Sequence, residues 1–329
     1  MTCSIRMEWI FLASGSSGNA SIVKWGQTCV LLDAGIPIRK LEKSLEKAKI
    51  DADHIRAIVL THTHSDHCNP LAVKYFLEKG IPVYLDGRLI APLQKKWKGS
   101  GGYPLRPLEA GRVQEILPGW ILHSHPLPHG EMPNLGILLE IDPGLFEPSL
   151  RLAYLTDLGT WNEKIADFAS GCDLIGLEFN HDEVMQQTSN RPTYLIARNL
   201  GDGGHLSNNQ AANCLREILS RSATRKPKAL IQLHLSRQCN KPDLAMKAAQ
   251  GVIDSISACQ LRVKTCKPGA NQLRIPWEAY RGRLGGQTRD KSRKETGSNR
   301  MKPPKKGESV RVKGVFETEA SQLFLFPME

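Results

Sequence analysis

Residues 57–67 read Ala-Ile-Val-Leu-Thr-His-Thr-His-Ser-Asp-His, a short apolar run followed directly by three histidines and one aspartate. The apolar run is short and β-branched, which predicts a buried strand. The cluster then occupies the loop at the carboxyl end of that strand, where α/β folds place their chemistry. Alternate residues of an extended chain point the same way, so His62 and His64 can hold one metal together. Asp66 and His67 follow on a tighter turn and can hold a second metal. Imidazole and carboxylate ligands suit zinc, manganese or iron.

The composition is that of an ordinary globular chain. It has 329 residues, of which 40% are hydrophobic, enough for one large domain or two small ones. No apolar run reaches the roughly 18–20 residues that a membrane span requires, and the opening segment 1–13 lacks the long apolar region of a signal peptide. The eight cysteines show no C-x-x-C spacing, which predicts reduced thiols. We therefore expect a cytoplasmic protein without membrane association.

The charge of the chain is unevenly distributed. The net charge is +11, and residues 281–329 carry 12 Lys/Arg against 6 Asp/Glu. This balance favours a polyanionic partner such as nucleic acid. After Trp277 the sequence is dominated by Gly, Ser, Lys, Arg and Pro, which cannot bury enough surface to fold alone. We expect one catalytic domain over residues 1–280 and a disordered basic tail over residues 281–329.

Strand and helix patterns alternate along the first 280 residues. Strands are expected at 9–13, 21–24, 29–32, 57–60, 82–85, 113–117, 120–126, 136–141, 152–156 and 229–233. Helices are expected at 38–48, 69–79, 207–220 and 243–253, with Asn69 and Ser207 as caps. Helices flanking two packed sheets suit this order better than a single doubly wound sheet.

The spacing His-x-His-x-Asp-His after an apolar strand resembles the metallo-β-lactamase superfamily. The resemblance implies an α/β (α+β) fold, a four-layer αββα sandwich with two metals at one edge. It also implies three further ligands, His129, Asp157 and His234, each of which follows an expected strand. His123 and His125, inside the strand 120–126, are alternatives to His129. Asp157 could instead be a helix cap.

The resemblance further implies how these ligands are divided between two divalent ions, zinc or manganese. His62, His64, His129 and Asp157 would hold the first ion, while Asp66, His67, Asp157 and His234 would hold the second. Such a pair activates a bridging water as hydroxide near neutral pH. Asp66 would orient that water and receive its proton.

Further segments resemble the YycJ/WalJ-like branch of this superfamily. They are Ala13–Asn19, Glu178–Asp182, Gly204–Asn208 and Leu233–Ser236. The resemblance implies a dinuclear phosphodiesterase, a 5′-to-3′ DNA exonuclease that acts in replication or repair. One alternative is a hydrolase of small cyclic or phosphonate-derived phosphodiesters. Another is a nucleic-acid-binding module without catalysis.

The same segments suggest residues that meet the substrate. By similarity with ribonuclease Z, His205 would donate a proton to the leaving oxygen or contact the phosphate, although it could also be a helix-entry histidine bonded to backbone. Ser16 and Asn19 lie in a loop that could bind a phosphate or could be only a tight turn. His181 could touch substrate or support another site residue.

The chain ends with an apolar peptide on the basic tail. Residues 322–326, Gln-Leu-Phe-Leu-Phe, resemble the peptide Gln-Leu-x-Leu-Phe that binds the bacterial replication sliding clamp. The resemblance implies that Gln322, Leu323, Leu325 and Phe326 contact this partner, with the tail as a flexible tether. The alternatives are a final strand that packs back on the domain, or a chance match.

Overall fold

The structure is a computed structural model, and it describes residues 7–97, 102–142, 144, 148–256, 259–269 and 272–280. The predicted basic tail, 281–329, and the predicted clamp-binding peptide, 322–326, lie outside the described residues. The domain boundary at residue 280 therefore stays a prediction.

The first sheet has seven strands in the order β14-β1-β2-β3-β4-β5-β6. Its central strands β3, β4 and β5 and its edge strand β6 run parallel, while β1, β2 and β14 pair antiparallel. The strands are β1 (Met7–Ala13), β2 (Ala20–Trp25), β3 (Thr28–Leu32), β4 (Ile55–Val59), β5 (Val83–Asp86), β6 (Leu105–Leu108) and β14 (Leu273–Pro276).

The second sheet repeats this plan with seven strands in the order β13-β12-β11-β10-β9-β8-β7. Here β10 to β13 run parallel, and β7, β8 and β9 pair antiparallel. The strands are β7 (Val113–Leu117), β8 (Trp120–Leu127), β9 (Asn134–Ile141), β10 (Leu150–Leu155), β11 (Leu174–Glu178), β12 (Ala229–Leu233) and β13 (Arg262–Thr265).

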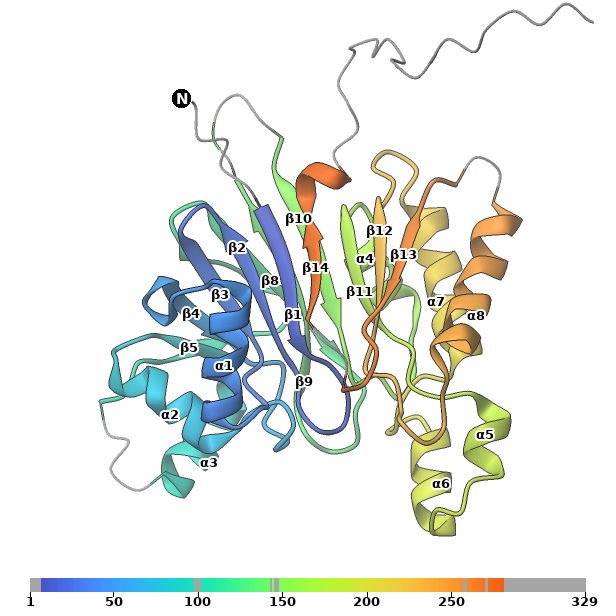
Figure 1. Ribbon diagram of the computed structural model, residues 1–329, viewed down its shortest axis with the longest axis horizontal. Coiled ribbons are helices and arrows are strands. Elements are labelled where there is room, and N and C mark those ends of the chain that lie inside the picture. Colours follow the sequence, from blue (N-terminus) through green and yellow to red (C-terminus); the bar gives the residue numbers. More distant parts are fainter. Residues whose placement is uncertain are drawn as a thin grey trace, which may run out of the picture. The chain divides into compact units, whose positions relative to one another are not determined.

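Helices cover the outer faces of both sheets (Figure 1). On the first sheet lie α1 (Ile38–Ala48), α2 (Pro70–Glu78) and α3 (Gly87–Lys96); on the second lie α4 (Glu163–Ala169), α7 (Asn208–Arg221) and α8 (Pro242–Ser255). The inner faces meet in one apolar core that contains Trp9, Val30, Leu152 and Ile231. Each sheet thus buries one face against its partner and the other against helices, and the predicted four-layer αββα sandwich is confirmed.

Local sequence signals account for several helix ends. Asn69 caps α2 by accepting a hydrogen bond from the Ala72 N–H, as its position before Pro70 predicts. Ser207 and Gln210 form a capping box at the start of α7. The sequence patterns do not predict the short helices α5 (Glu183–Gln187) and α6 (Thr193–Leu200), nor α3, α4, β6, β13 and β14.

The topology brings distant residues to one edge of the sandwich. Parallel neighbouring strands end at the same edge, so the segments after β3 and β4 meet there. The segments after β10, β11 and β12 meet in the same way at the edge of the second sheet. These five strand ends carry Asp33, the loop 61–67, Asp157, Glu178 and His234.

The sequence predicts no membrane-spanning segment. Within the part of the chain that the structure describes, no helix is long and apolar enough to cross a bilayer.

Candidate active site

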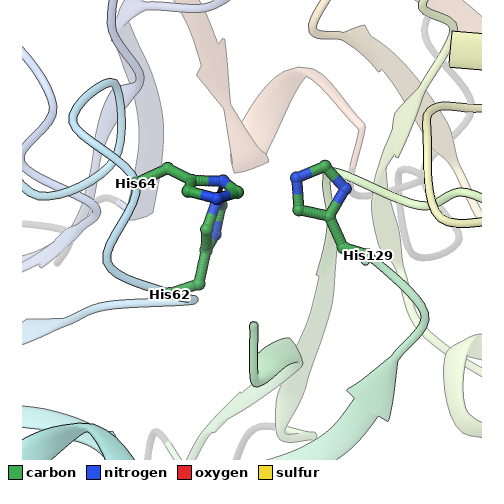
Figure 2. A group of neighbouring side chains, drawn as sticks. All are labelled: His62, His64 and His129. Carbon is green, nitrogen blue, oxygen red and sulfur yellow. Dashed lines mark hydrogen bonds between the residues drawn. The ribbon is translucent and has the colours of Figure 1, made fainter. Parts of the chain in front are cut away.

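Three histidines form the first group of possible metal ligands (Figure 2). His62 and His64 come from the loop after β4, with His62 Nε2 3.0 Å from His64 Nδ1. His129 faces them from the loop after β8, with ring centroids 5.4 Å from His62 and 5.1 Å from His64. Burial lowers the pKa of all three imidazoles, so they are held in the neutral form that can ligate a metal.

Asp66, His67 and His234 form the second group. Asp66 Oδ2 lies 3.8 Å from His67 Nε2 and 3.6 Å from His234 Nε2. The His234 Nε2 atom is buried and has no hydrogen-bond partner among the described residues. A buried ring nitrogen without a partner is costly, and a cation between Asp66, His67 and His234 would satisfy it.

Asp157 lies between the two groups. Its Oδ2 is 2.8 Å from His67 Nε2, while its Oδ1 is 3.7 Å from His129 Nε2 and 3.7 Å from His234 Nδ1. The carboxylate is therefore placed within reach of both groups, and its role as a shared metal ligand stays a prediction. Asn134 fixes its backbone by donating a side-chain hydrogen bond of 2.8 Å to the Asp157 carbonyl.

The electrostatics of the site favour cations. Burial opposes ionisation of Asp157, but His234 and His67 outweigh it and hold the pKa of this carboxyl well below its usual range. Conversely, burial opposes a charged His234, yet Asp157, Asp66 and Glu178 raise its pKa to about 10. The carboxylates thus stabilise positive charge in the space between the groups. The donor types, their convergence and this potential fit divalent metal ions.

Asp33 positions His67, a member of the second group, and the sequence did not reveal this role. Its Oδ2 lies 2.8 Å from His67 Nδ1 and accepts a hydrogen bond from the Tyr154 hydroxyl. Its Oδ1 accepts the Thr61 N–H. A carboxylate on one ring nitrogen leaves the other free for a metal. The signal available in the sequence was an acidic residue directly after a buried strand and two residues before Gly35. In the structure Gly35 has no room for a side chain, because a Cβ there would lie only 1.7 Å from the Asp66 carbonyl oxygen.

Glu178 was likewise not assigned a role from the sequence. It is fully buried at the end of β11, and its Oε1 lies 2.9 Å from His205 Nδ1 and 2.8 Å from His234 Nδ1. Its Oε2 accepts the backbone N–H groups of Leu158 and Leu206. Burial alone would raise the pKa of Glu178, but the two imidazoles outweigh it and hold that pKa at about 2. One carboxylate therefore orients two site histidines.

Backbone strain is concentrated at these residues. Among the described non-glycine residues, positive φ occurs at Lys49, which ends α1, and at Asp33 (56°), Asp157 (58°) and His234 (54°). The left-handed region is unfavourable for most side chains, and aspartate and histidine tolerate it better than most. The sharp turn after each strand aims the side chain back into the site, a pattern typical of functional positions.

The residues predicted to contact substrate lie in different surroundings. His205 has an 18% exposed side chain and faces an open groove, with its Nδ1 turned to Glu178. Ser16 is exposed and lines the same groove. Asn19 is buried, and its Nδ2 lies 2.8 Å from His67 Nε2 and 3.2 Å from the Asp66 carbonyl oxygen. Its amide is thus committed to the metal loop, and a substrate contact of Asn19 stays a prediction.

His181 is fully buried, and neither ring nitrogen has a hydrogen-bond partner among the described residues. Burial lowers its pKa to about 4, against the opposing effect of Glu178. This neutral ring lies beneath the surface, so its role stays a prediction. The alternatives to His129 lie elsewhere: His123 faces Glu140 and His125 stacks on Phe168. Neither belongs to a group of possible ligands.

Comparison with known proteins identifies a matching family model and similar sequences. The family model described as "Beta-lactamase superfamily domain" matches residues 28–225. The chain is 26% identical over 259 residues to "Exodeoxyribonuclease YycJ" of Bacillus anthracis, covering 75% of this chain and 89% of the relative. It is 27% identical over 248 residues to "Exodeoxyribonuclease WalJ" of Streptococcus pneumoniae, covering 73% of this chain and 86% of the relative.

Solved structures share the fold at lower identity. The metallo-beta-lactamase fold protein YhfI from Bacillus subtilis aligns with a TM-score of 0.58 and 16% identity, covering 82% of this chain and 99% of that protein. A diphosphatase from the PhnP family aligns with a TM-score of 0.55 and 16% identity, covering 83% of this chain and 98% of that protein. At this identity the likeness supports the fold alone.

Proposed function

The chain belongs to the beta-lactamase superfamily domain family and is a metal-dependent hydrolase, and from this premise we propose that it is a dinuclear phosphodiesterase that degrades DNA as a 5′-to-3′ exonuclease. The observation that carries the proposal is the convergence of two ligand groups on the single carboxylate of Asp157. The Glu178–His205 pair beside it supplies a proton-transfer group at the mouth of the site. The names of the two relatives, both exodeoxyribonucleases, support DNA as the substrate.

Each side chain has a distinct role in this proposal. When bound, two divalent ions, zinc or manganese, would lower the pKa of a water from about 15.7 toward 7 and offset the negative charge of the phosphate. Asp66 has a 23% exposed side chain, and it orients the attacking water and receives its proton. His205 turns Nδ1 to Glu178, so its Nε2 lies on the other side of the ring, where it protonates the leaving oxygen.

The direction of degradation can be tested with labelled DNA. We expect a strand labelled at its 5′ end to lose the label at once as a mononucleotide, because cleavage starts at that end. The same strand labelled at its 3′ end is expected to give a ladder of shortening products. The measurement is a denaturing gel with Mn²⁺ or Zn²⁺, and with a chelator as the blank.

Other product patterns would contradict parts of the proposal. A ladder from the 5′-labelled strand would overturn the polarity. Turnover of a small cyclic phosphodiester without turnover of DNA would favour the alternative substrate class. DNA binding without any hydrolysis by the metal-loaded protein would favour a non-catalytic binding module.

We also propose that the terminal peptide 322–326 recruits the enzyme to the bacterial replication sliding clamp, which would place it at replicating or repaired DNA in the cytoplasm. Replacing Leu325 and Phe326 by alanine is expected to weaken clamp binding by more than about tenfold, since such buried apolar anchors dominate short-peptide binding. Binding to immobilised clamp measures the effect. Phe324→Ala, at the variable position of the peptide, is the matched control, and equal retention of all three proteins would refute the tether.

A further inference from the structure

Two hollows flank the ridge formed by Ser16–Ser17 and Arg237–Gln238. The first has a volume of about 880 Å³ and begins at the active site, because His205 lines it together with Arg191 and Arg198. The second has a volume of about 90 Å³ and is lined by Lys40, Arg237 and Lys267. Ser16 and Gln238 line the first hollow, whereas their chain neighbours Ser17 and Arg237 line the second. The two segments that we call the ridge therefore lie between the hollows.

Both hollows are basic. No aspartate or glutamate lines either of them among the described residues. None of the five cations, Lys40, Arg191, Arg198, Arg237 and Lys267, forms an ion pair with a carboxylate in the described part of the chain, whereas arginines elsewhere, such as Arg221 and Arg225, are paired. Unpaired cations in a concave surface concentrate a positive potential there.

The arginines at the ridge are held in place by neutral groups. Arg237 donates to Ser17 Oγ at 3.0 Å, and Arg191 donates to Gln238 Oε1 at 2.9 Å. Each guanidinium has five N–H donors, so several remain for an anion. The chain just before the ridge is bonded to the possible metal site, because the His234 N–H donates to Ser14 Oγ at 2.9 Å. Two of the cations, Arg191 and Arg237, are thus anchored close to the possible ligand His234.

We propose that the ridge and its two hollows form a path for the phosphates of a nucleic-acid strand, which contacts the enzyme at one or more phosphates beyond the one that is cut. The inference rests on the proposed function and deepens it, since a path of this kind takes a polymer and not a small phosphodiester. A small diester reaches the metal site but leaves the second hollow empty. A strand that enters past His205 extends over the ridge to Arg237 and Lys267.

The helix α6, which contributes to the lining of the first hollow, carries an aromatic residue suited to binding a nucleic-acid strand. Leu195 of α6 lines this hollow, and the adjacent Tyr194 is 75% exposed. Tyr194 does not itself line the hollow, but an exposed aromatic ring one residue from its lining is available for the stacking of bases. Phosphate contacts and a stacking platform together are typical of single-strand binding.

The test compares two substrates in the full-length, metal-loaded protein. The variant carries Arg237→Gln with Lys267→Gln, and the matched control carries Lys95→Gln with Lys96→Gln on α3, which lines neither hollow. The substrates are a labelled single strand of about 20 nucleotides, longer than most single-strand sites, and bis(p-nitrophenyl) phosphate. Strand affinity is also measured over a range of salt concentrations.

We expect the variant to lose roughly tenfold more kcat/KM on the strand than on the small diester, and the control to show no such difference. The slope of log Kd against log salt should fall by about 0.7 for each phosphate of the single strand that the variant no longer binds. Equal losses on both substrates, or a salt slope equal to that of the control, would overturn the path. If wild type cleaves neither substrate, the proposed function fails, and the change in salt slope alone still decides whether the path binds DNA.

Discussion

Replacing Asp157 by asparagine is expected to lower the rate of phosphodiester hydrolysis by roughly 10³-fold, because the two metals of the proposed site would lose their shared ligand. A metal pair contributes several kcal/mol of charge stabilisation, and each 1.36 kcal/mol corresponds to a tenfold rate. The asparagine side chain would keep one oxygen but not the charge that Asp157 offers to both ligand groups. Metal content per protein molecule and kcat/KM on DNA should fall together.

Asparagine is the appropriate replacement because of the backbone. Asp157 has φ 58°, a conformation that asparagine adopts more readily than alanine does. It is also buried beside His67, His129 and His234, so a smaller side chain would leave a polar cavity. The pKa of Asp157 is held well below its usual range, so its charge stabilises the metal-free fold, and we expect the thermal midpoint of the metal-free variant to fall by several degrees while the protein still folds. Asp142→Asn, the same chemical change at an exposed position, is the control.

A normal metal content and rate in the Asp157→Asn protein would contradict the bridging role. A loss of activity accompanied by unfolding of the metal-free protein would instead assign Asp157 to stability. Circular dichroism of the chelated proteins separates these two results.

The main layers of the fold could be predicted because their signals are local. The strand 57–60 and the helix 38–48 follow from the spacing of apolar residues, and the structure has β4 at Ile55–Val59 and α1 at Ile38–Ala48. The elements that were missed have weak or interrupted patterns. The helix α3 contains Pro92 in its interior, which usually argues against a helix. The strands β6, β13 and β14 have four residues each and lie at sheet edges.

The residues of the site also divide into those that could be predicted from the sequence and those that could not. All seven predicted ligands converge in the structure, since each follows a strand and parallel strands end at one edge. Asp33 and Glu178 also follow or end strands, but their contacts depend on which histidine ring approaches them in space. His67 is 34 residues from Asp33, and His234 is 56 residues from Glu178. A single sequence carries no signal for such pairings.

Replacing Glu178 by glutamine is expected to lower kcat/KM on DNA by roughly 100-fold, the range observed when a group that orients a ligand or a proton donor is removed. The carboxylate accepts an N–H from the Nδ1 atoms of both His205 and His234. It therefore leaves Nε2 of His234 free for a metal and gives a protonated His205 a counter-ion. A glutamine NH₂ turned to the same two nitrogens would favour the other tautomer of each ring. Its remaining oxygen can still accept the Leu158 N–H, so we expect the fold to persist.

Activity on two substrates distinguishes whether Glu178 acts through His205 or through His234. A p-nitrophenolate leaving group needs little protonation, whereas the alkoxide released from DNA needs a proton. If Glu178 acts mainly through His205, then Glu178→Gln and His205→Ala lose much more activity on DNA than on bis(p-nitrophenyl) phosphate. If Glu178 acts mainly through His234, the activity of Glu178→Gln falls equally on both substrates, and its metal content falls as well. Glu140→Gln, which alters a carboxylate 3.8 Å from His123 outside the ligand groups, should change neither readout. Full activity of Glu178→Gln on DNA would show that the buried carboxylate orients neither ring.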